Sequence, residues 1–470
     1  MGGSSGHLRG TSAGMRVRAT GAGHSRSPLY VDEGNIMMDV RDLRSHEGVW
    51  MRINPETAER KFKTLTAMTG VYEVEMNEFM IKNNVTVLAQ PLNDQETLGG
   101  MVAASTHGST YDEPTYSSFV VEMRLIDSQG RLRRFTIEKH PQIMKAAICN
   151  LGMFGIMYDI TIKVHPARIV KVVNTFVPLK DLFYNQTALK EQISGNFMNE
   201  ISWFPFNNLS PEEEEYYIKN NKAPETWNAG KDILWVRTIN PVSEAELAGK
   251  NLTGSIYLPS NGSLAGGSAP GLLKAKGSVE LARKVPAVLY QYLVHAFPII
   301  LPPLTGVETS AAFMLNIDSQ FDRPFRAINF MVNTTEKQIK QNASTPMNAL
   351  LPRWFKNHNC YLCPGNDEIT MADDSGKTLV IDFLAPPAQY GFYPAAEAFV
   401  EKFKDEKLRP HWAKRHDNIP GIINVIKNVY GPLLPGFQDQ KRLADVDPCD
   451  MFMNSYLLSV FGRSKNCYYY

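Results

Sequence analysis

Two short segments of the sequence carry side chains that suit redox or proton-transfer chemistry, and the first is a glycine-rich loop. It reads G-A-G-H-S-R-S-P over residues 21–28, follows a predicted strand and holds His24 among small neighbours. Glycines let successive backbone N–H groups approach a phosphate closely, and serine hydroxyls add further donors. The loop lacks the third glycine of the dinucleotide fingerprint G-x-G-x-x-G, and Pro28 prevents an immediate helix, so it does not fit a Rossmann phosphate loop. It predicts an anion-binding loop of another type, with an ordinary glycine turn as the alternative.

The second segment, R-P-H-W-A-K over residues 409–414, combines an imidazole with an ammonium group. Oxidising an alcohol or a lactol by hydride transfer requires a group that accepts or polarises the hydroxyl proton, and a cation that stabilises the developing negative charge. His411 and Lys414 offer one of each, and on a helix or turn their spacing of three places them on the same side. The alternative is a surface histidine and lysine beside a buried Trp412.

Two further glycine-bearing segments adjoin predicted strands. G-G-M-V-A-A-S-T-H-G-S, residues 99–109, has small residues at eight of its eleven positions. Packed cores rarely use so little side chain, whereas a backbone pressed against a flat ligand does. G-M-F-G-I, residues 152–156, opens a strand in the same way. Three such loops predict one extended cofactor.

The elements that must position these loops are mainly short strands in the first third of the chain. Alternating apolar residues and turn signals predict a strand-rich unit with one buried amphipathic helix near residues 72–83 and a hairpin whose turn is D-S-Q-G. The last strand stops before Pro166, where we place a domain boundary. The predicted strands are residues 15–20, 35–40, 48–53, 60–67, 119–126, 131–137 and 156–164, and residues 141–149 are predicted to be helical.

The rest of the chain mixes helices and strands around an acidic run at residues 211–215 and a Gly/Ser/Pro-rich stretch at residues 251–271. We therefore predict an α+β protein of two domains, residues 1–167 and residues 168–470. The predicted strands here are residues 233–237, 311–317, 326–332 and 378–383, and the predicted helices are residues 395–403 and 421–429.

Composition excludes several classes of protein. The 470 residues hold 49 Lys+Arg and 48 Asp+Glu, a net charge of +1, and no basic block, so nucleic acid is not an expected partner. The 43% hydrophobic and 10% aromatic content is that of a globular protein and excludes collagen-like, disordered and coiled-coil chains.

The cysteines and one apolar stretch could form disulfides, a zinc site or a membrane-spanning segment. Five cysteines are too few for a disulfide scaffold. His358, Cys360 and Cys363 have partial zinc-ligand spacing without a nearby fourth ligand, so we predict no metal and two loop thiols. Residues 285–304 have the length of a membrane span, but Gln291, His295 and four prolines make a poor spanning helix. A buried helix is favoured, and an interfacial membrane patch is the alternative.

Taken in order, three segments resemble the FAD-binding domain of the vanillyl-alcohol oxidase type flavoproteins: R-A-T-G-A-G-H-S-R-S-P, P-L-N-D-Q-E-T-L-G-G-M-V-A-A-S-T-H-G-S and N-L-G-M-F-G-I-M-Y-D-I-T-I-K-V. R-P-H-W-A-K and D-P-C-D-M-F-M-N-S-Y-L, residues 447–457, resemble the sugar-1,4-lactone oxidase branch, which includes L-gulonolactone and D-arabinono-1,4-lactone oxidases. The resemblance is good over residues 15–164 and 408–461 and thin between them. Family members carry several tens of residues before the first loop, whereas about twenty precede Gly21 here. We therefore expect an FAD-binding domain shortened at its N-terminus, followed by an α+β substrate or cap domain.

The resemblance implies a set of residues around FAD. The first loop would wrap the pyrophosphate and ribityl chain, with His24 bonded covalently to the 8α-methyl of the flavin ring; a histidine that only hydrogen-bonds is the alternative. His411 and Lys414 would be the catalytic pair. The family also tends to place an acidic residue and an arginine on strands over the flavin, whereas residues 328–333, the stretch compared with it, offer asparagines. The implied cofactor-binding residues are Gly21, Ala22, Gly23, His24, Ser25, Ser27, Gly99, Gly100, Ser105, Thr106, His107, Gly108, Gly155 and Ile156.

The activity that the resemblance implies is FAD-dependent oxidation of a sugar-1,4-lactone, as in ascorbate-type biosynthesis, with electrons passed on to oxygen or to an electron carrier. An alditol or polyol oxidase on the same fold is one alternative, and a degenerate, non-catalytic flavoprotein is another. The sequence carries no recognised targeting signal and fixes no compartment. Animal family members suggest the endoplasmic reticulum membrane, with peripheral association through residues 285–304, and the cytoplasm is the alternative.

Overall fold

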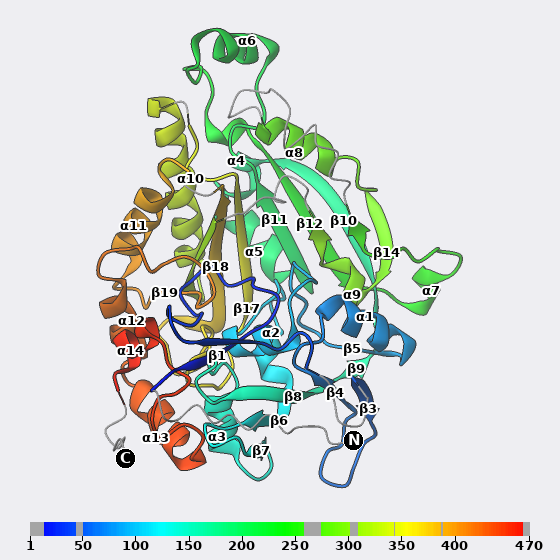
Figure 1. The fold of residues 1–470 in the computed structure, drawn as a ribbon. Coiled ribbons are helices and arrows are strands. Elements are labelled where there is room, and N and C mark those ends of the chain that lie inside the picture. The colour runs from blue at the N-terminus through cyan, green and yellow to red at the C-terminus, as the bar shows by residue number, and fades with distance from the viewer. Residues whose placement is uncertain are drawn as a thin grey trace.

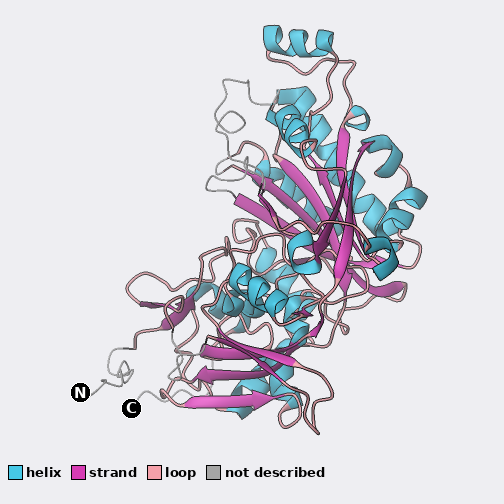
Figure 2. Cartoon of the chain, turned by 90° about the vertical axis from the view of Figure 1, so that its right-hand side faces the viewer, coloured by secondary structure: helices cyan, strands magenta, loops and turns pink. Residues whose placement is uncertain are grey.

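Two β-sheets, one above the other in Figure 1, organise the part of the chain that the computed structural model describes. That part comprises residues 14–43, 50–257, 274–300, 309–342, 344–386 and 389–463. The mixture of sheets and helices confirms the predicted α+β class. Figure 2, turned by 90°, shows helices between the two sheets as well as on their outer sides.

The smaller sheet has five antiparallel strands in the order β3-β4-β8-β6-β7. The central strand β8 is buried along nearly all of its length, and Asp127 closes the β6–β7 hairpin by accepting hydrogen bonds from the backbone N–H groups of Gln129 and Arg131. A separate parallel pair, β1 and β2, leads into and out of the first glycine loop. The strands are β1 (Val17–Thr20), β2 (Ile36–Asp39), β3 (Met51–Asn54), β4 (Thr64–Met68), β5 (Val85–Thr86), β6 (Val120–Ile126), β7 (Leu132–Thr136), β8 (Ile156–Lys163) and β9 (His165–Pro166). The helices are α1 (Glu73–Lys82), α2 (Leu98–Ala104) and α3 (Pro141–Ala147).

The larger sheet has eight antiparallel strands in the order β14-β10-β12-β11-β17-β18-β16-β19. Helices α10, α11 and α12 line its left side in Figure 1, and α6 projects at the top. Its strands are β10 (Ile169–Pro178), β11 (Met198–Trp203), β12 (Ile233–Pro241), β14 (Val288–Tyr292), β16 (Thr309–Asp318), β17 (Ala349–Lys356), β18 (Asp374–Ala385) and β19 (Arg409–Pro410), and β13 (Ile256–Tyr257) pairs separately with β15 (Ile299–Ile300). The helices are α4 (Leu179–Leu182), α5 (Gln186–Ser194), α6 (Pro211–Asn220), α7 (Glu244–Leu247), α8 (Lys274–Ala282), α9 (Leu293–Ala296), α10 (Asp322–Asn342), α11 (Phe392–Phe403), α12 (Ile422–Tyr430), α13 (Leu434–Ala444) and α14 (Ser455–Phe461).

The end of the chain returns to its beginning. Helix α13 packs on α3, and the backbone N–H of Val17 donates to the carbonyl of Met451 at 2.9 Å. Arg18 is buried and donates to the carbonyls of Leu29, Leu151 and Phe452. Early, middle and late segments therefore meet beside the first glycine loop.

Most predicted elements are confirmed, including the strands of the first third, the hairpin, and the helices that became α1, α3, α11 and α12. The strand predicted at residues 326–332 is wrong, because this stretch is the middle of α10. Its β-branched and aromatic residues suggested a strand. The buried positions Ile328, Met331, Thr335 and Ile339 instead repeat every three or four residues, as in an amphipathic helix.

The helix favoured for residues 285–304 is also wrong. Residues 288–292 form β14, which pairs with β10, and only Leu293–Ala296 is helical, while residues 301–308 lie outside the described part. Prolines on both sides of this stretch stop a longer helix, and the open edge of β10 offers backbone pairing instead. Among the described residues, no helix has both the length and the apolar character needed to cross a membrane.

The two predicted loop thiols are joined. Cys360 and Cys363 form a disulfide within the loop that follows β17. The C-x-x-C spacing allows this bridge without a change in the backbone, which the zinc-based interpretation of the sequence did not consider.

Candidate functional site

A cavity of about 550 Å³ lies where the glycine loops meet the larger sheet. Its wall is formed by the loop after β1, the start of α2, the turn before β8, strands β16, β17 and β18, and the segment after β19. The predicted residues that line it are Gly21, Ala22, Gly23, His24, Ser25, Gly99, Gly100, Thr106, His107, Gly155, His411 and Lys414.

Four predicted cofactor residues do not line the cavity and instead support its wall. Ser27 is buried and donates its hydroxyl to the carbonyl of Trp412. The Ser105 hydroxyl lies 2.9 Å from that of Thr115, and Ile156 packs in a small core cluster. Gly108 has the carbonyl of Gln90 where a Cβ would be, so glycine is needed there for chain packing. The structure thus separates residues that can touch a ligand from those that shape the loops.

The glycine loops fit an elongated, phosphate-bearing cofactor. A methyl group at Gly21 would overlap Thr97 Oγ1, so only glycine lets the first loop lie against the start of α2. Gly23 has a φ of +77° and only Tyr30 OH near its missing Cβ, at 4.0 Å, which leaves its backbone open to the cavity. Backbone N–H groups and small hydroxyl side chains are the donors that phosphate and ribityl oxygens require. The residues present therefore fit FAD.

His24 stands at the wall of this cavity. Its Nε2 lies 3.1 Å from the carbonyl of Gln95, and its Nδ1 lies 3.2 Å from Asn93 Nδ2. Because a carbonyl can only accept, Nε2 carries the proton and Nδ1 accepts from the amide of Asn93. These two contacts hold the imidazole in one orientation.

His411 and Lys414 are brought together by a turn at the end of β19. The backbone N–H of Lys414 donates to the carbonyl of His411 at 3.0 Å, and that of His411 donates to the carbonyl of Ala312 on β16 at 2.9 Å. Both side chains line the cavity, as their spacing predicted. The Lys414 ammonium has no hydrogen-bond or ion-pair partner among the described residues.

The two cavity histidines, His411 and His107, offer a ligand opposite hydrogen-bonding groups, one a donor and the other an acceptor. The backbone N–H of Ala413 donates to His411 Nδ1 at 3.1 Å, so the proton of neutral His411 is on Nε2. His107 Nδ1 donates to the carbonyl of Gly108 at 3.1 Å, so its Nε2 keeps a lone pair. The ring centroids are 5.2 Å apart. A substrate oxygen between them would meet one donor and one acceptor.

Burial keeps both rings neutral. Desolvation, aided by the charge of Arg353, lowers the pKa of His107 to about 3. Desolvation, followed by the proximity of His107, lowers the pKa of His411 well below its usual value. A neutral imidazole can exchange a proton with a substrate without first losing one to water.

Sequence reasoning missed two charged residues of the cavity, Arg353 on β17 and Asp382 on β18. Asp382 is paired with Leu351, and Arg353 lies two residues further along β17, so both point from the same face of the sheet. Arg353 Nη2 and Asp382 Oδ2 are 3.9 Å apart. Arg353 Nε and Asp382 Oδ1 are buried without a hydrogen-bond partner in the described part of the chain. Buried polar atoms of this kind are normally satisfied, so these two are available to a ligand.

The choice of residues 328–333 as the stretch to compare with the family's acidic residue and arginine is therefore corrected, because the arginine and the acid that line the cavity are Arg353 and Asp382. Residues 328–333 lie in α10, away from the cavity, and the pair comes from two other strands. The signal was present in the sequence, as single charges inside the apolar runs L-L-P-R-W-F and V-I-D-F-L. A charge in a buried strand is costly unless it serves a partner or a ligand.

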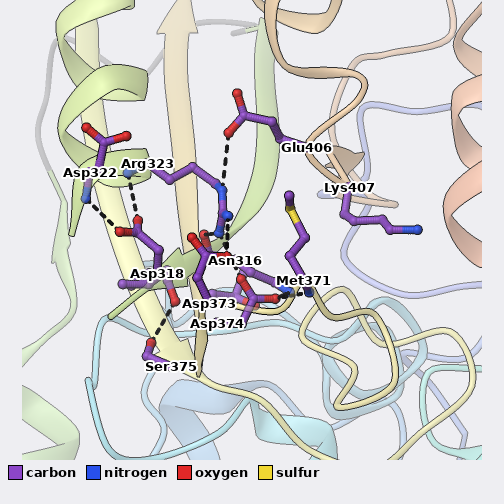
Figure 3. Close-up of polar contacts among 12 residues, drawn as sticks. Asn316, Asp318, Asp322, Arg323, Met371, Asp373, Asp374, Ser375, Glu406 and Lys407 are labelled. Atoms are coloured by element: carbon purple, nitrogen blue, oxygen red, sulfur yellow. Dashed lines mark hydrogen bonds and ion pairs between the residues drawn. The ribbon is translucent and has the colours of Figure 1, made fainter. Parts of the chain in front are cut away.

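A buried polar network fixes the segment that carries His411. Arg409 is buried and donates to Asn316 Oδ1 at 2.7 Å, and Asn316 Nδ2 donates to Asp374 Oδ2 at 2.5 Å. Asp374 Oδ1 accepts from Arg323 Nη1 at 2.8 Å, which links the network to α10 (Figure 3). The disulfide loop also contributes, because Trp412 Nε1 donates to the carbonyl of Leu362 at 2.7 Å.

Comparisons with known proteins also indicate an FAD-binding domain. A family profile described as an FAD binding domain matches residues 10–136. The chain is 27% identical over 199 residues to the D-arabinono-1,4-lactone oxidase of Candida albicans; the match covers 42% of this chain and 35% of that enzyme. It is 21% identical over 457 residues to the L-gulonolactone oxidase of Bos taurus, covering 95% of this chain and 90% of that enzyme.

Solved structures extend the likeness to the whole fold. Cholesterol oxidase from Brevibacterium sterolicum superposes with a TM-score of 0.73 at 14% identity, covering 95% of this chain and 90% of the other. A solvent-stable cholesterol oxidase gives a TM-score of 0.70 at 17% identity, with 96% and 90% covered. The aligned part of the yeast relative spans only about a third of that enzyme's length, whereas the fold match spans nearly all of both chains. Residues 10–136 thus match an FAD-binding domain, and the described part of the chain shares the fold of cholesterol oxidase.

Proposed function

We propose that this protein is an FAD-dependent oxidoreductase that oxidises a carbinol of a sugar-1,4-lactone of the ascorbate-biosynthesis type, with oxygen as the final acceptor. The observation that carries the proposal is the meeting of Arg353, Asp382, His411 and Lys414 in a cavity walled by glycine loops. The names of the two relatives support the lactone as substrate. Bound FAD supplies the hydride acceptor, and the protein supplies binding, orientation and proton transfer.

Arg353 and Asp382 are suited to hold the sugar. The free Nε–H of Arg353 donates to a carbonyl or ring oxygen of the lactone, and the free Oδ1 of Asp382 accepts from a hydroxyl. Both groups are already shielded from water. They therefore favour a polar substrate that forms hydrogen bonds with both groups over one that forms none. Their place on adjacent strands makes the site rigid.

His107, His411 and Lys414 are suited to manage the proton and the charge. The lone pair on His107 Nε2 accepts a hydrogen bond from the carbinol hydroxyl, while His411 Nε2–H donates one to the same oxygen, so the two rings orient the hydroxyl for hydride loss. The Lys414 ammonium stabilises the negative charge that develops in the cavity. Of the two roles expected for His411, accepting or polarising the hydroxyl proton, the protonated Nε2 supports the polarising one, in which His411 acts as a hydrogen-bond donor.

The test is the replacement of Lys414 by methionine. One ammonium in a water-poor cavity contributes about 3 kcal/mol to a transition state, so Lys414→Met should slow flavin reduction about a hundredfold. FAD content should stay close to that of the parent, because the first glycine loop contacts this segment through the backbone, which the substitution keeps. Stopped-flow reduction by L-gulono-1,4-lactone and D-arabinono-1,4-lactone measures the rate, with a sugar alcohol in parallel.

The matched control is Lys404→Met, which removes an exposed lysine directly after α11 that, among the described residues, forms an ion pair with Glu401. A Lys414→Met rate within threefold of the Lys404→Met rate would assign Lys414 to the surface. Faster reduction by the sugar alcohol than by either lactone would replace the lactone with a polyol as substrate class.

A further inference from the structure

His416 is a buried histidine that neither lines the cavity nor belongs to the residues so far given a role. Its Nδ1 lies 2.7 Å from the carbonyl of Lys414, and its Nε2 lies 2.5 Å from the hydroxyl of Tyr456 on α14. The ring therefore joins the proposed catalytic lysine to a helix near the end of the chain. Nothing in the proposed chemistry uses this contact directly.

The partners fix the proton positions on the ring. The Lys414 carbonyl can only accept, so His416 Nδ1 carries the proton, and Nε2 must accept from the Tyr456 hydroxyl. Burial lowers the pKa of His416 to about 4, which keeps this single neutral form in place at neutral pH. The imidazole thus acts as a rigid link between two specific atoms.

Helix α14 is itself tied to the first glycine loop. At its N-cap, Asn454 Nδ2 donates to the carbonyls of Pro28 at 2.7 Å and Tyr30 at 2.5 Å. The loop in turn contacts the lysine segment, because the backbone N–H of Arg26 donates to the carbonyl of Ala413 at 2.7 Å. Hydrogen bonds therefore form a closed ring through the glycine loop, the lysine segment and α14.

We propose that Tyr456, acting through His416, is a positioning residue that sets the place of Lys414 relative to the loop that binds the cofactor. This inference rests on the proposed role of Lys414. Tyr456 does not line the cavity, and it acts by fixing the backbone carbonyl of Lys414 while the N-cap of the same helix fixes the first glycine loop. Helix α14 then holds Lys414 and the first glycine loop in a fixed position relative to each other.

The first test is Tyr456→Phe, which keeps the ring but leaves His416 Nε2 without its donor. We expect flavin reduction by the lactone to slow about tenfold, with unchanged FAD content and unchanged lactone KM, because Arg353 and Asp382 are undisturbed. Hydrogen–deuterium exchange of the peptide spanning residues 411–416 should become faster, in the apoprotein as well as in the holoenzyme.

The matched control is Tyr430→Phe. Tyr430 is fully buried, whereas Tyr456 is partly buried; Tyr430 packs against Trp412 with ring centroids 5.2 Å apart, but its hydroxyl has no hydrogen bond among the described residues. It should leave both the rate and the exchange of residues 411–416 near parent values. Equal effects of the two variants would show that the loss of either tyrosine hydroxyl has the same effect, and would overturn the inference.

A double-mutant cycle distinguishes positioning from general loosening. If Tyr456 acts through Lys414, Tyr456→Phe should slow the parent but not the Lys414→Met enzyme. Equal slowing in both backgrounds overturns the inference, as does a Tyr456→Phe rate within twofold of the parent while Lys414→Met is slow. A Lys414→Met enzyme at the parent rate instead overturns the proposed role of the lysine itself.

Discussion

Four histidines show how the partner, and not the residue type, decides what an imidazole can do in this protein. A backbone N–H makes His411 a donor at Nε2, whereas a backbone carbonyl makes His107 an acceptor at Nε2. His416 is used on both sides as a link, and His24 is held at the cavity wall by Gln95 and Asn93. The sequence shows the four residues but not the partners, which come from other segments.

At the residue scale we predict that His24→Ala abolishes acid-stable flavin. If His24 is the attachment point, its loss leaves only the loop backbone contacts, so FAD should become dissociable while some binding remains. Denaturing gel electrophoresis followed by in-gel flavin fluorescence measures this directly. His295→Ala, which removes a histidine paired with Glu78 away from the cavity, is the control and should keep the parent signal. Flavin that stays on denatured His24→Ala protein would place the attachment at another residue.

At the element scale, periodicity and turn residues sufficed to predict most strands and helices, because those signals are local. The glycine loops and the His411–Lys414 turn were likewise predictable, since each is one contiguous segment. Arg353 and Asp382 were missed because their meeting depends on the pairing of β17 with β18, which no local pattern encodes. The link between His416 and Tyr456 was missed for the same reason, because the two residues are forty positions apart in the sequence.

Also at this scale, Arg323 should prove much more important for stability than its neighbour Arg326 on α10. Arg323 is buried and pairs with Asp374, whose carboxylate is equally buried, and with Asp373 and Glu406 (Figure 3). Removing one partner of a buried pair leaves an uncompensated charge, so Arg323→Met should cost about 3–5 kcal/mol in the free energy of unfolding.

Arg326→Met is the matched control for that change. Arg326 forms comparable ion pairs with Asp322 and Glu406, but its side chain is 40% exposed, so its loss should cost no more than about 1 kcal/mol. Urea unfolding of both variants decides between them. Equal losses would mean that the Arg323 network contributes no more than a surface pair.

At the scale of the whole molecule, the cavity is built from both ends and the middle of the chain. Its wall takes Gly21 from the first loop, Arg353 and Asp382 from the larger sheet, and Lys414 from the late segment that α14 holds in place. No single third of the sequence could form it. A ligand that touches all of these segments binds only the folded chain, and therefore stabilises the whole molecule.

The corresponding prediction is a rise in the melting temperature when FAD is added to apoprotein, measured in a His24→Ala background so that binding stays reversible. At a free concentration of a hundred times Kd, binding adds about 2.7 kcal/mol. An unfolding entropy of about 2.1 cal/mol/K per residue amounts to roughly 1 kcal/mol/K for a chain of this length, so the shift should be roughly 3 °C. Gly21→Ala should lose most of this shift, because its Cβ would push the first loop away from Thr97 and the start of α2. Gly254→Ala, where nothing lies within 4 Å of an added Cβ, should keep it. A full shift in folded Gly21→Ala protein would show that the close approach of these two segments is not needed to hold the cofactor.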